Sequence, residues 1–203
     1  MLCLTATASI KNRKKIIKIL HMKETKFMCL SPDKTNIKYV VQIAIKDGEL
    51  EKTFSWLIKD LKDNGYNTKK TILFCSSLKE CGDIYDTLLQ CLPETHLKYI
   101  GMYHARTPER LKDQVLRDIV KYDSQIRLVV ATSALGMGIN IPDISRVLHY
   151  GIPEDIEAYV QATGRGGRDG SSVFCVLYYR NYHLRNCDVK MREFIKNKEH
   201  CHR

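Results

Sequence analysis

The sequence lacks long apolar runs, and none of its 203 residues lie in a stretch near the roughly 20 apolar residues that a membrane-spanning helix needs. Met1–Ile10 does not combine a basic start with a long apolar stretch, so no secretion signal is visible. None of the eight cysteines forms a Cys-x-x-Cys pair, and several lie within apolar runs. We therefore expect a soluble protein with reduced thiols in an intracellular compartment and no membrane partner.

Positive charge is in excess. Lysine and arginine outnumber aspartate and glutamate by 33 to 23, which gives a formal net charge of +10. Such an excess favours phosphate-rich partners such as nucleic acid, because binding releases counterions from the phosphates. A lysine-rich face turned to solvent would give the same total, so the charge alone leaves both interpretations open. Hydrophobic residues make up 44% of the chain, which is enough for a packed core.

Short apolar runs alternate with amphipathic stretches, a pattern typical of a parallel α/β sheet. We expect strands at Ile37–Ile45, Thr71–Cys75, Tyr99–Tyr103, Ile126–Ala131, Arg146–Tyr150 and Val173–Tyr179, and the end of another buried strand at Met1–Leu4. Helical spacing predicts six helices, the first at 11–20 and the fifth from Pro153 onward. The other four are marked by apolar stripes: Phe54, Leu57, Ile58 and Leu61; Cys81, Ile84, Leu88 and Cys91; Leu111, Val115 and Ile119; and Leu184, Cys187, Met191, Phe194 and Ile195. Thr107 is expected to cap the helix after it, with Pro108 at the first helical position.

A glycine-rich run with two arginines, QATGRGGRDG at 161–170, follows the helix predicted from Pro153. Glycines let the backbone approach a partner closely, and guanidinium groups match phosphate oxygens as a planar fork. Arg165 and Arg168 on one tight turn therefore predict a grip for a triphosphate. The alternative is a basic glycine loop on the surface.

A second run, VVATSALGMGIN at 129–140, reads as a buried strand that ends in hydroxyls and small residues. Ligands of open α/β sheets bind outside the carboxyl ends of the strands. Thr132 and Ser133 can donate to a phosphate there, and the glycines expose backbone N–H groups. An ordinary strand-to-loop turn explains this run equally well, but its place ahead of the arginine turn favours a phosphate site.

These runs resemble the RecQ branch of the superfamily 2 helicases. ATSALGMGINIPD at 131–143 and VLHYGIPEDIEAYVQATGRGGRDG at 147–170 resemble motifs V and VI of that family. TILFCSSLKEC at 71–81 resembles motif IV, and Tyr103–Ala105 resembles its Tyr-His-Ala segment. Leu4–Ala8 resembles motif III, the last motif of the first motor domain.

The resemblance implies an α/β fold, a RecA-like parallel sheet flanked by helices. It further implies an ATP-dependent motor that uses Mg²⁺, moves 3′ to 5′ on single-stranded DNA and unwinds forked duplex, in the nucleus and in DNA repair, recombination or replication. Under it, residues 1–30 are the tail of the first RecA-like domain and 31–36 a junction. Residues 37–180 are then the second RecA-like domain, and 181–203 the start of a truncated zinc-binding region.

The resemblance also implies roles for single residues. Arg168 matches the arginine finger, Arg165 its partner near the γ-phosphate, and Gln161 a residue that positions the nucleotide. The nucleotide-binding set is Gly138, Asp143, Gly164, Arg165 and Arg168, and the set at the DNA backbone is Ser76, Ser77, His104, Thr132 and Ser133. Backbone contacts carry no sequence information, so we expect sequence-tolerant binding.

The chain departs from the family pattern at Leu78, Arg106 and Ala162, where arginine, glycine and glutamate are usual. It contains no G-x-x-x-x-G-K-[ST] loop and no D-E-x-H motif, which supply the phosphate cradle and the Mg²⁺ site of such motors. We therefore expect no ATP hydrolysis by this chain alone, whether it is part of a longer gene product or a degenerate copy.

Near the carboxyl terminus, Cys201-His202-Arg203 follows the last predicted helix. The resemblance implies that Cys201 is the first ligand of a zinc module, with zinc bound in a full-length protein only. The residues also allow a local zinc site of His183, Cys187, Cys201 and His202, or a core-facing cysteine with solvated histidines.

Three hypotheses remain open. The chain is part of an ATP-dependent DNA helicase, a truncated DNA-binding paralogue without ATPase activity, or part of an RNA-directed helicase. The GMGIN and GRGGRDG runs argue against the third.

Overall fold

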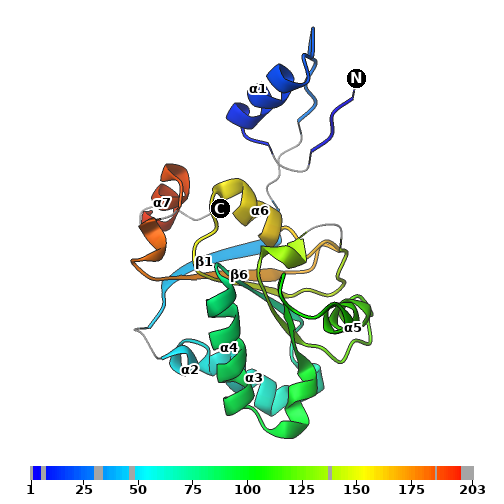
Figure 1. Ribbon diagram of the computed structural model, residues 1–203, viewed down its shortest axis with the longest axis vertical. Coiled ribbons are helices and arrows are strands. Elements are labelled where there is room, and N and C mark those ends of the chain that lie inside the picture. Colours follow the sequence, from blue (N-terminus) through cyan, green and yellow to red (C-terminus); the bar gives the residue numbers. More distant parts are fainter. Residues whose placement is uncertain are drawn as a thin grey trace.

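The computed structural model describes residues 2–5, 8–29, 34–45, 49–136, 139–185 and 187–197 (Figure 1). The α-helices are α1 (Ile10–Ile19), α2 (Leu50–Thr53), α3 (Ser55–Asn64), α4 (Leu78–Cys91), α5 (Glu109–Ile119), α6 (Ile156–Thr163) and α7 (Val189–Lys196). The strands are β1 (Ile37–Ile43), β2 (Thr71–Cys75), β3 (Ile100–Tyr103), β4 (Leu128–Ala131), β5 (Arg146–Tyr150) and β6 (Val173–Tyr179). Short 3₁₀ helices lie at η1 (Gly65–Asn67), η2 (Glu94–Tyr99), η3 (Ser133–Gly136) and η4 (His183–Arg185).

The six strands form one parallel sheet in the order β1-β6-β5-β2-β4-β3. Strands β2 and β4 are buried along their whole length, because helices cover both faces of a parallel sheet. Successive side chains of β2 point to opposite faces, so Leu73 joins one core cluster and Ile72 the other. The predicted fold class is confirmed.

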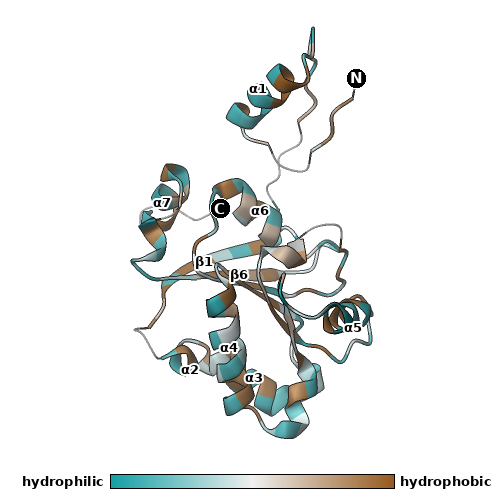
Figure 2. Ribbon diagram, viewed as in Figure 1, coloured by the Kyte–Doolittle hydropathy of each residue, from teal (hydrophilic) through white to brown (hydrophobic). Residues whose placement is uncertain are grey.

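Helices α2, α3 and α4 cover one face of the sheet, and α5, α6 and α7 cover the other (Figure 1). Figure 2 shows that the helices carry both apolar and polar residues along their length, and their buried apolar residues belong to the core clusters with those of the strands. Helix α1 stands away from the sheet and contains no buried residue. Its start is joined to α6, where the Glu157 carboxylate accepts hydrogen bonds from the Ser9 backbone N–H and the Asn12 side chain at 2.6 and 2.7 Å.

The buried strand expected at the start of the chain is wrong for the residues that the structure describes there. Residues 2–5 form no strand, and Leu2 and Leu4 are 81% and 83% exposed. An apolar run becomes a strand only when a neighbouring strand pairs with it, and no described strand lies beside this one. The residues of the junction at 31–33 lie outside the described part of the chain.

The predicted start of α5 is also wrong in detail. Pro108 is the N-cap residue with φ −52° and ψ 137°, and no side chain caps the helix. The Thr107 hydroxyl instead accepts a hydrogen bond from the backbone N–H of His104 at 3.1 Å. Leu111 is half exposed, so the buried face of α5 consists of Val115 and Ile119 without it.

The final apolar stripe is split between two elements. Leu184 lies in η4, and α7 begins only after Asp188, whose carboxylate accepts a hydrogen bond from the Met191 backbone N–H at 2.6 Å. This N-cap starts a new helix, since a side-chain acceptor satisfies one of its free N–H groups. Met191 and Ile195 then pack in a cluster with Tyr159 of α6.

Candidate functional site

Five of the predicted site residues lie along one edge of the sheet. Ser76 and Ser77 follow β2, Thr132 and Ser133 follow β4, and His104 follows β3. These three strands are neighbours in the sheet and run parallel, so their carboxyl ends meet at the same edge. We call these five residues the hydroxyl edge.

The two serines of the hydroxyl edge are engaged by a carboxylate. Oε2 of Glu80 accepts hydrogen bonds from the hydroxyls of Ser76 and Ser77 at 2.5 and 3.0 Å. Ser77 is also the N-cap of α4, where its Oγ accepts a bond from the Glu80 backbone N–H. A phosphate at these serines would therefore compete with Glu80 for both hydroxyl protons.

The other carboxylate oxygen of Glu80 connects this turn by hydrogen bonds to Tyr182 and to His183 of η4. Oε1 accepts from the Tyr182 hydroxyl at 2.8 Å and lies 2.7 Å from Nε2 of His183. Nδ1 of His183 accepts from the backbone N–H of Arg180, so the proton of the neutral ring is on Nε2 and is donated to Glu80. The hydrogen bonds outweigh the opposing effect of burial and hold the pKa of Glu80 down to about 2.

A pocket of about 440 Å³ opens between the carboxyl ends of β2 and β5 and helix α6. The hydroxyl edge supplies Ser76 and Ser133 to its lining. Helix α6 and the turn after it supply Ala158, Gln161, Ala162 and Arg165, which share one face at helical spacing. The charged residues in its lining are Arg165 and Glu154.

Arg165 is buried at the inner end of this pocket. The residue is only 7% exposed, and its Nε has no hydrogen-bond partner among the described residues. Burial lowers the pKa of Arg165, and the nearby positive charge of Arg168 lowers it further. Ala162 lines the same pocket and brings no carboxylate to the guanidinium. A buried cation with a free donor is a place where an anionic group gains a strong hydrogen bond.

A buried histidine lines the pocket beside Arg165. The His149 ring stacks on Phe74 with centroids 5.4 Å apart, and it meets Tyr159 edge to face at 5.1 Å. Its Nε2 has no partner among the described residues. Burial lowers the pKa of His149 to about 3, so the ring is neutral at neutral pH.

The arginine turn is held in place by the segment before β1. Nζ of Lys34 donates to the Gly164 carbonyl at 2.9 Å, and the Asn36 side chain donates to the carbonyls of Gly167 and Ser171. The backbone N–H of Gly167 donates to the Ile144 carbonyl at 3.3 Å. Gly167 has φ +58°, and a Cβ there would lie 2.3 Å from the Asn36 amide nitrogen, so only glycine fits.

The two arginines have different surroundings. Arg168 is exposed, and its guanidinium donates to Oδ1 of Asn140 at 2.6 Å. Arg165 is buried and lines the pocket that Ser133 also lines, next in the chain to Thr132. One turn thus presents a solvent-accessible cation and a buried one.

The remaining predicted nucleotide residues are spread out. Asp143 is an exposed residue with φ +59°, three residues before the start of β5, so it lies at the amino end of the strand whose carboxyl end forms the pocket. Gly164 is the C-cap of α6 and the residue that Lys34 contacts. Gly138 and Cys201 lie outside the described residues.

The structure adds three residues to the site that the sequence does not single out. Glu80 binds the serines, His149 lines the pocket, and Asn140 holds Arg168. The pattern Ser77-x-x-Glu80 is a capping-box signal that could have found the first. No local pattern marks the other two, because their partners are distant in the sequence.

The local zinc site is not formed by the residues that the structure describes. Both ring nitrogens of His183 are hydrogen bonded, and the buried Cys187 thiol donates to the Leu184 carbonyl at 3.6 Å. Within the described ranges, no three His, Cys, Asp or Glu side chains come together to hold a metal ion.

No helix in those ranges is both long and apolar enough to cross a membrane.

Comparison with known proteins finds helicases among the relatives of this chain. A putative ATP-dependent RNA helicase, R290, of Acanthamoeba polyphaga mimivirus is 34% identical over 88% of this chain, and the match covers 30% of that protein. The RecQ-like DNA helicase BLM of Xenopus laevis is 33% identical over 90% of this chain, and the match covers 12% of its length. The chain thus spans less than a third of these relatives.

A solved structure of Dbp5 of S. cerevisiae, bound to RNA and ADP BeF3, matches 96% of this chain and 49% of its own with a TM-score of 0.72 at 20% identity, which supports the RecA-like fold. Residues 52–170 match the family model of the helicase conserved C-terminal domain. The chain therefore belongs to the family of helicase C-terminal domains, and RecQ-type helicases are among its relatives.

Proposed function

We propose that this chain is the second motor lobe of an ATP-dependent 3′–5′ DNA helicase of RecQ type, which acts on single-stranded and forked DNA in the nucleus. In this proposal residues 1–30 belong to the first lobe, and residues 181–203 lead into a zinc-binding region. The observation that carries the proposal is the arginine turn, which places the buried Arg165 in the lining of the pocket that Ser76 and Ser133 share and leaves the Arg168 guanidinium exposed.

On the nucleotide side, Arg168 is the arginine finger. Its contact with Asn140 is exposed, so it can be exchanged for the γ-phosphate of an ATP held by the first lobe. Such a finger stabilises the negative charge that builds up during phosphoryl transfer. Gln161 of α6 and Arg165 of the turn after it line the pocket and orient the nucleotide from the side of this lobe.

Within the described ranges, no three His, Cys, Asp or Glu side chains form a group that could hold a metal ion. The metal and the phosphate cradle belong to the first lobe in this proposal. This chain contributes positive charge and hydrogen-bond donors to the nucleotide, and it is inactive in hydrolysis when alone.

On the nucleic-acid side, the hydroxyl edge contacts the phosphate backbone. The side chains of Thr132 and Ser133 make no hydrogen bond to another residue of the described ranges, whereas the hydroxyls of Ser76 and Ser77 are held by Glu80. We therefore assign the first contact to Thr132 and Ser133, with the serines joining when a phosphate displaces Glu80.

Fluorescence anisotropy with labelled single-stranded DNA, forked duplex and RNA of the same sequence tests the nucleic-acid part. Thr132→Val keeps the shape of the side chain and removes the hydroxyl, so we expect about tenfold weaker DNA binding. Thr87→Val on the exposed side of α4 is the matched control. Equal binding by the two variants would remove the hydroxyl edge from the nucleic-acid path. Tighter binding of RNA than of DNA would reject the DNA substrate and favour the activity named for the mimivirus relative.

A chimera tests the nucleotide part, with residues 37–180 placed in a RecQ-type helicase instead of its own second lobe. We expect DNA-stimulated ATP hydrolysis, which Arg168→Ala lowers roughly a thousandfold and Lys62→Ala leaves unchanged. The 203-residue chain alone should show no hydrolysis above background. Hydrolysis by the chimera that does not depend on Arg168 would contradict its role as the finger.

A second candidate is a DNA-binding module without ATPase activity. The net charge of +10 favours it, because phosphate binding by this charge needs no second lobe. In that case the chain binds DNA with the same dependence on Thr132, but the chimera does not hydrolyse ATP.

A further inference from the structure

Strand β3 is an edge strand with a free side. It pairs only with β4, and no strand among the described residues lies beyond it. The carbonyls of Tyr99 and Tyr103 accept from the N–H groups of Arg127 and Thr132, so these residues face β4. In a parallel ladder the backbone groups of alternate residues face alternate sides. The N–H and C=O of Met102 therefore point to the open side.

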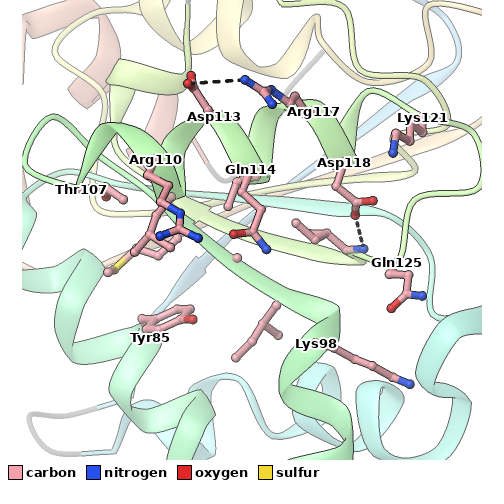
Figure 3. Close-up of a pocket in the computed structure, with 16 residues that line it drawn as sticks. Tyr85, Lys98, Thr107, Arg110, Asp113, Gln114, Arg117, Asp118, Lys121 and Gln125 are labelled. Atoms are coloured by element: carbon pink, nitrogen blue, oxygen red, sulfur yellow. Dashed lines mark hydrogen bonds and ion pairs between the residues drawn. The ribbon is translucent and has the colours of Figure 1, made fainter.

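A groove of about 870 Å³ runs along this free edge. One wall is α5, with Arg110 and Gln114, and the other wall includes Tyr85 of α4 and Lys98 of η2 (Figure 3). Apolar side chains contribute to its lining: Ile100, Met102, Leu111, Val115 and Ile126. A Cβ at Gly101 would lie 3.2 Å from a methyl group of Val115, so the glycine allows α5 to pack closely against β3.

The groove carries an excess of positive charge. Lys98, Arg110, Arg117 and Lys121 line it together with Asp113 and Asp118, and the pairing of Arg117 with Asp113 leaves three cations against Asp118. Asp118 is already satisfied, because it accepts from the Ser124 hydroxyl at 2.8 Å and from the Ile126 N–H at 3.0 Å. Asp113 is turned to the other side of α5, where it lies 3.9 Å from the Arg117 guanidinium (Figure 3). Arg110 points into the groove from α5 with no acidic partner in the described ranges.

We propose that this groove binds an extended, acidic peptide segment of a partner protein, which pairs with the free edge of β3 as a further strand. Strand addition satisfies the open N–H and C=O of Met102, and side chains on alternate positions meet the apolar lining or the cations. The four residues of β3 fit a segment of about four residues, or roughly 13 Å. A phosphate backbone fits less well, since it neither pairs with a strand edge nor covers the apolar lining.

The test uses the 203-residue chain and a labelled peptide that alternates glutamate with valine, with binding followed by fluorescence anisotropy at low salt. Arg110→Glu should weaken binding about tenfold, because it reverses the charge that faces the peptide. The matched control is Lys62→Glu, which makes the same change of net charge at an exposed site on α3 outside the groove. It should change binding by less than about twofold. Glutamate is well placed in the first turn of α5, so Arg110→Glu should fold normally.

Two further measurements separate strand addition from simple charge attraction. A peptide N-methylated along one edge cannot pair with β3 through that edge, so methylation of the pairing edge should abolish binding. Bound peptide should also slow hydrogen exchange of the Met102 amide. No binding of the unmodified peptide, or equal binding of peptides methylated on either edge, overturns the proposal. So does oligonucleotide binding that Arg110→Glu weakens as much as peptide binding, which would make the groove a nucleic-acid path.

Discussion

A single carboxylate controls two hydroxyls of the hydroxyl edge. Glu80 accepts hydrogen bonds from both serines after β2 and also from the two aromatic side chains Tyr182 and His183. It thereby stabilises the turn and, at the same time, places a negative charge where a phosphate would bind. These two effects have opposite signs, so stability and nucleic-acid affinity should respond in opposite directions to its removal.

Glu80→Gln should raise the affinity for single-stranded DNA by roughly threefold to tenfold, because a like charge is removed from the path of the phosphates. The same change should lower the free energy of unfolding by about 2 kcal/mol, because hydrogen bonds to a charged group are replaced by weaker ones. Anisotropy and urea denaturation measure the two effects. Glu94→Gln, at an exposed position in η2, is the control. A loss of affinity in Glu80→Gln would show that the carboxylate assists binding.

His149 should make the fold sensitive to acid. Its pKa is lowered by burial from 6.5 to about 3, so the unfolded chain takes up a proton below about pH 6.5 that the folded chain does not. The stability contributed by the neutral ring is complete above pH 6.5 and is lost as the pH falls, by about 1.4 kcal/mol per pH unit. Glu80 adds a second loss only below about pH 4.5, as the pH falls toward its lowered pKa.

Urea denaturation between pH 4.5 and 6.5 isolates the histidine, and His149→Leu should remove most of the slope in that window. His21→Asn, at an exposed position, should leave the slope as it is. An unchanged slope in His149→Leu would mean that another group takes up the proton.

At the residue scale, the sequence predicts residue types better than their surroundings. It predicts that Arg165 and Arg168 form a phosphate-binding pair, and both lie on the predicted turn. It does not reveal that one is buried and the other exposed, because burial is set by Phe74, Ser133 and other residues far away in the chain. The hydrogen bond between Asn140 and Arg168 is not predicted for the same reason, because the two residues are distant in the sequence.

At the scale of elements, apolar composition predicted the buried strands well. The bounds of β2, β5 and β6 agree with the sequence, since these strands are mostly apolar and mostly buried. The errors lie where local signals compete. Thr107 can cap a helix or bond to the preceding turn, and the structure uses it for His104. The apolar run at residues 2–5 has no strand beside it.

Substitution by alanine should change the stability of the fold in opposite directions at two glycines, Gly167 in the arginine turn and Gly82 in α4. Gly167→Ala should cost more than about 2 kcal/mol, because the backbone has φ +58° and the new Cβ would overlap Asn36 and the Ser171 carbonyl. Gly82→Ala should gain about 0.5–1 kcal/mol, because Gly82 lies within α4 and nothing is within 4 Å of the new Cβ. Thermal denaturation of the two variants measures the contrast. Similar stability of both would mean that the arginine turn tolerates another backbone conformation.

At the scale of the whole molecule, the net charge of +10 should dominate nucleic-acid binding. Each phosphate contact releases counterions, so we expect affinity for DNA to fall by at least about tenfold between about 50 and 200 mM salt. Anisotropy titrations across this range give the slope. A peptide nucleic acid of the same sequence, with no phosphates, should not bind. A slope near zero would leave the positive charge without a role in binding.

The order of strands also has a consequence for biosynthesis. Strands β2, β3, β4 and β5 follow one another in the chain and form one contiguous block of the sheet, in the order β5-β2-β4-β3. They can therefore pair with one another once β5 has left the ribosome. Strand β1 is made before them, but its only neighbour is β6, in a register that sets Ile37 beside Val173. The first of these six strands to emerge is thus among the last to be fixed. Its final position also brings Lys34 and Asn36 to the arginine turn, so the turn is completed only when synthesis has passed the last strand.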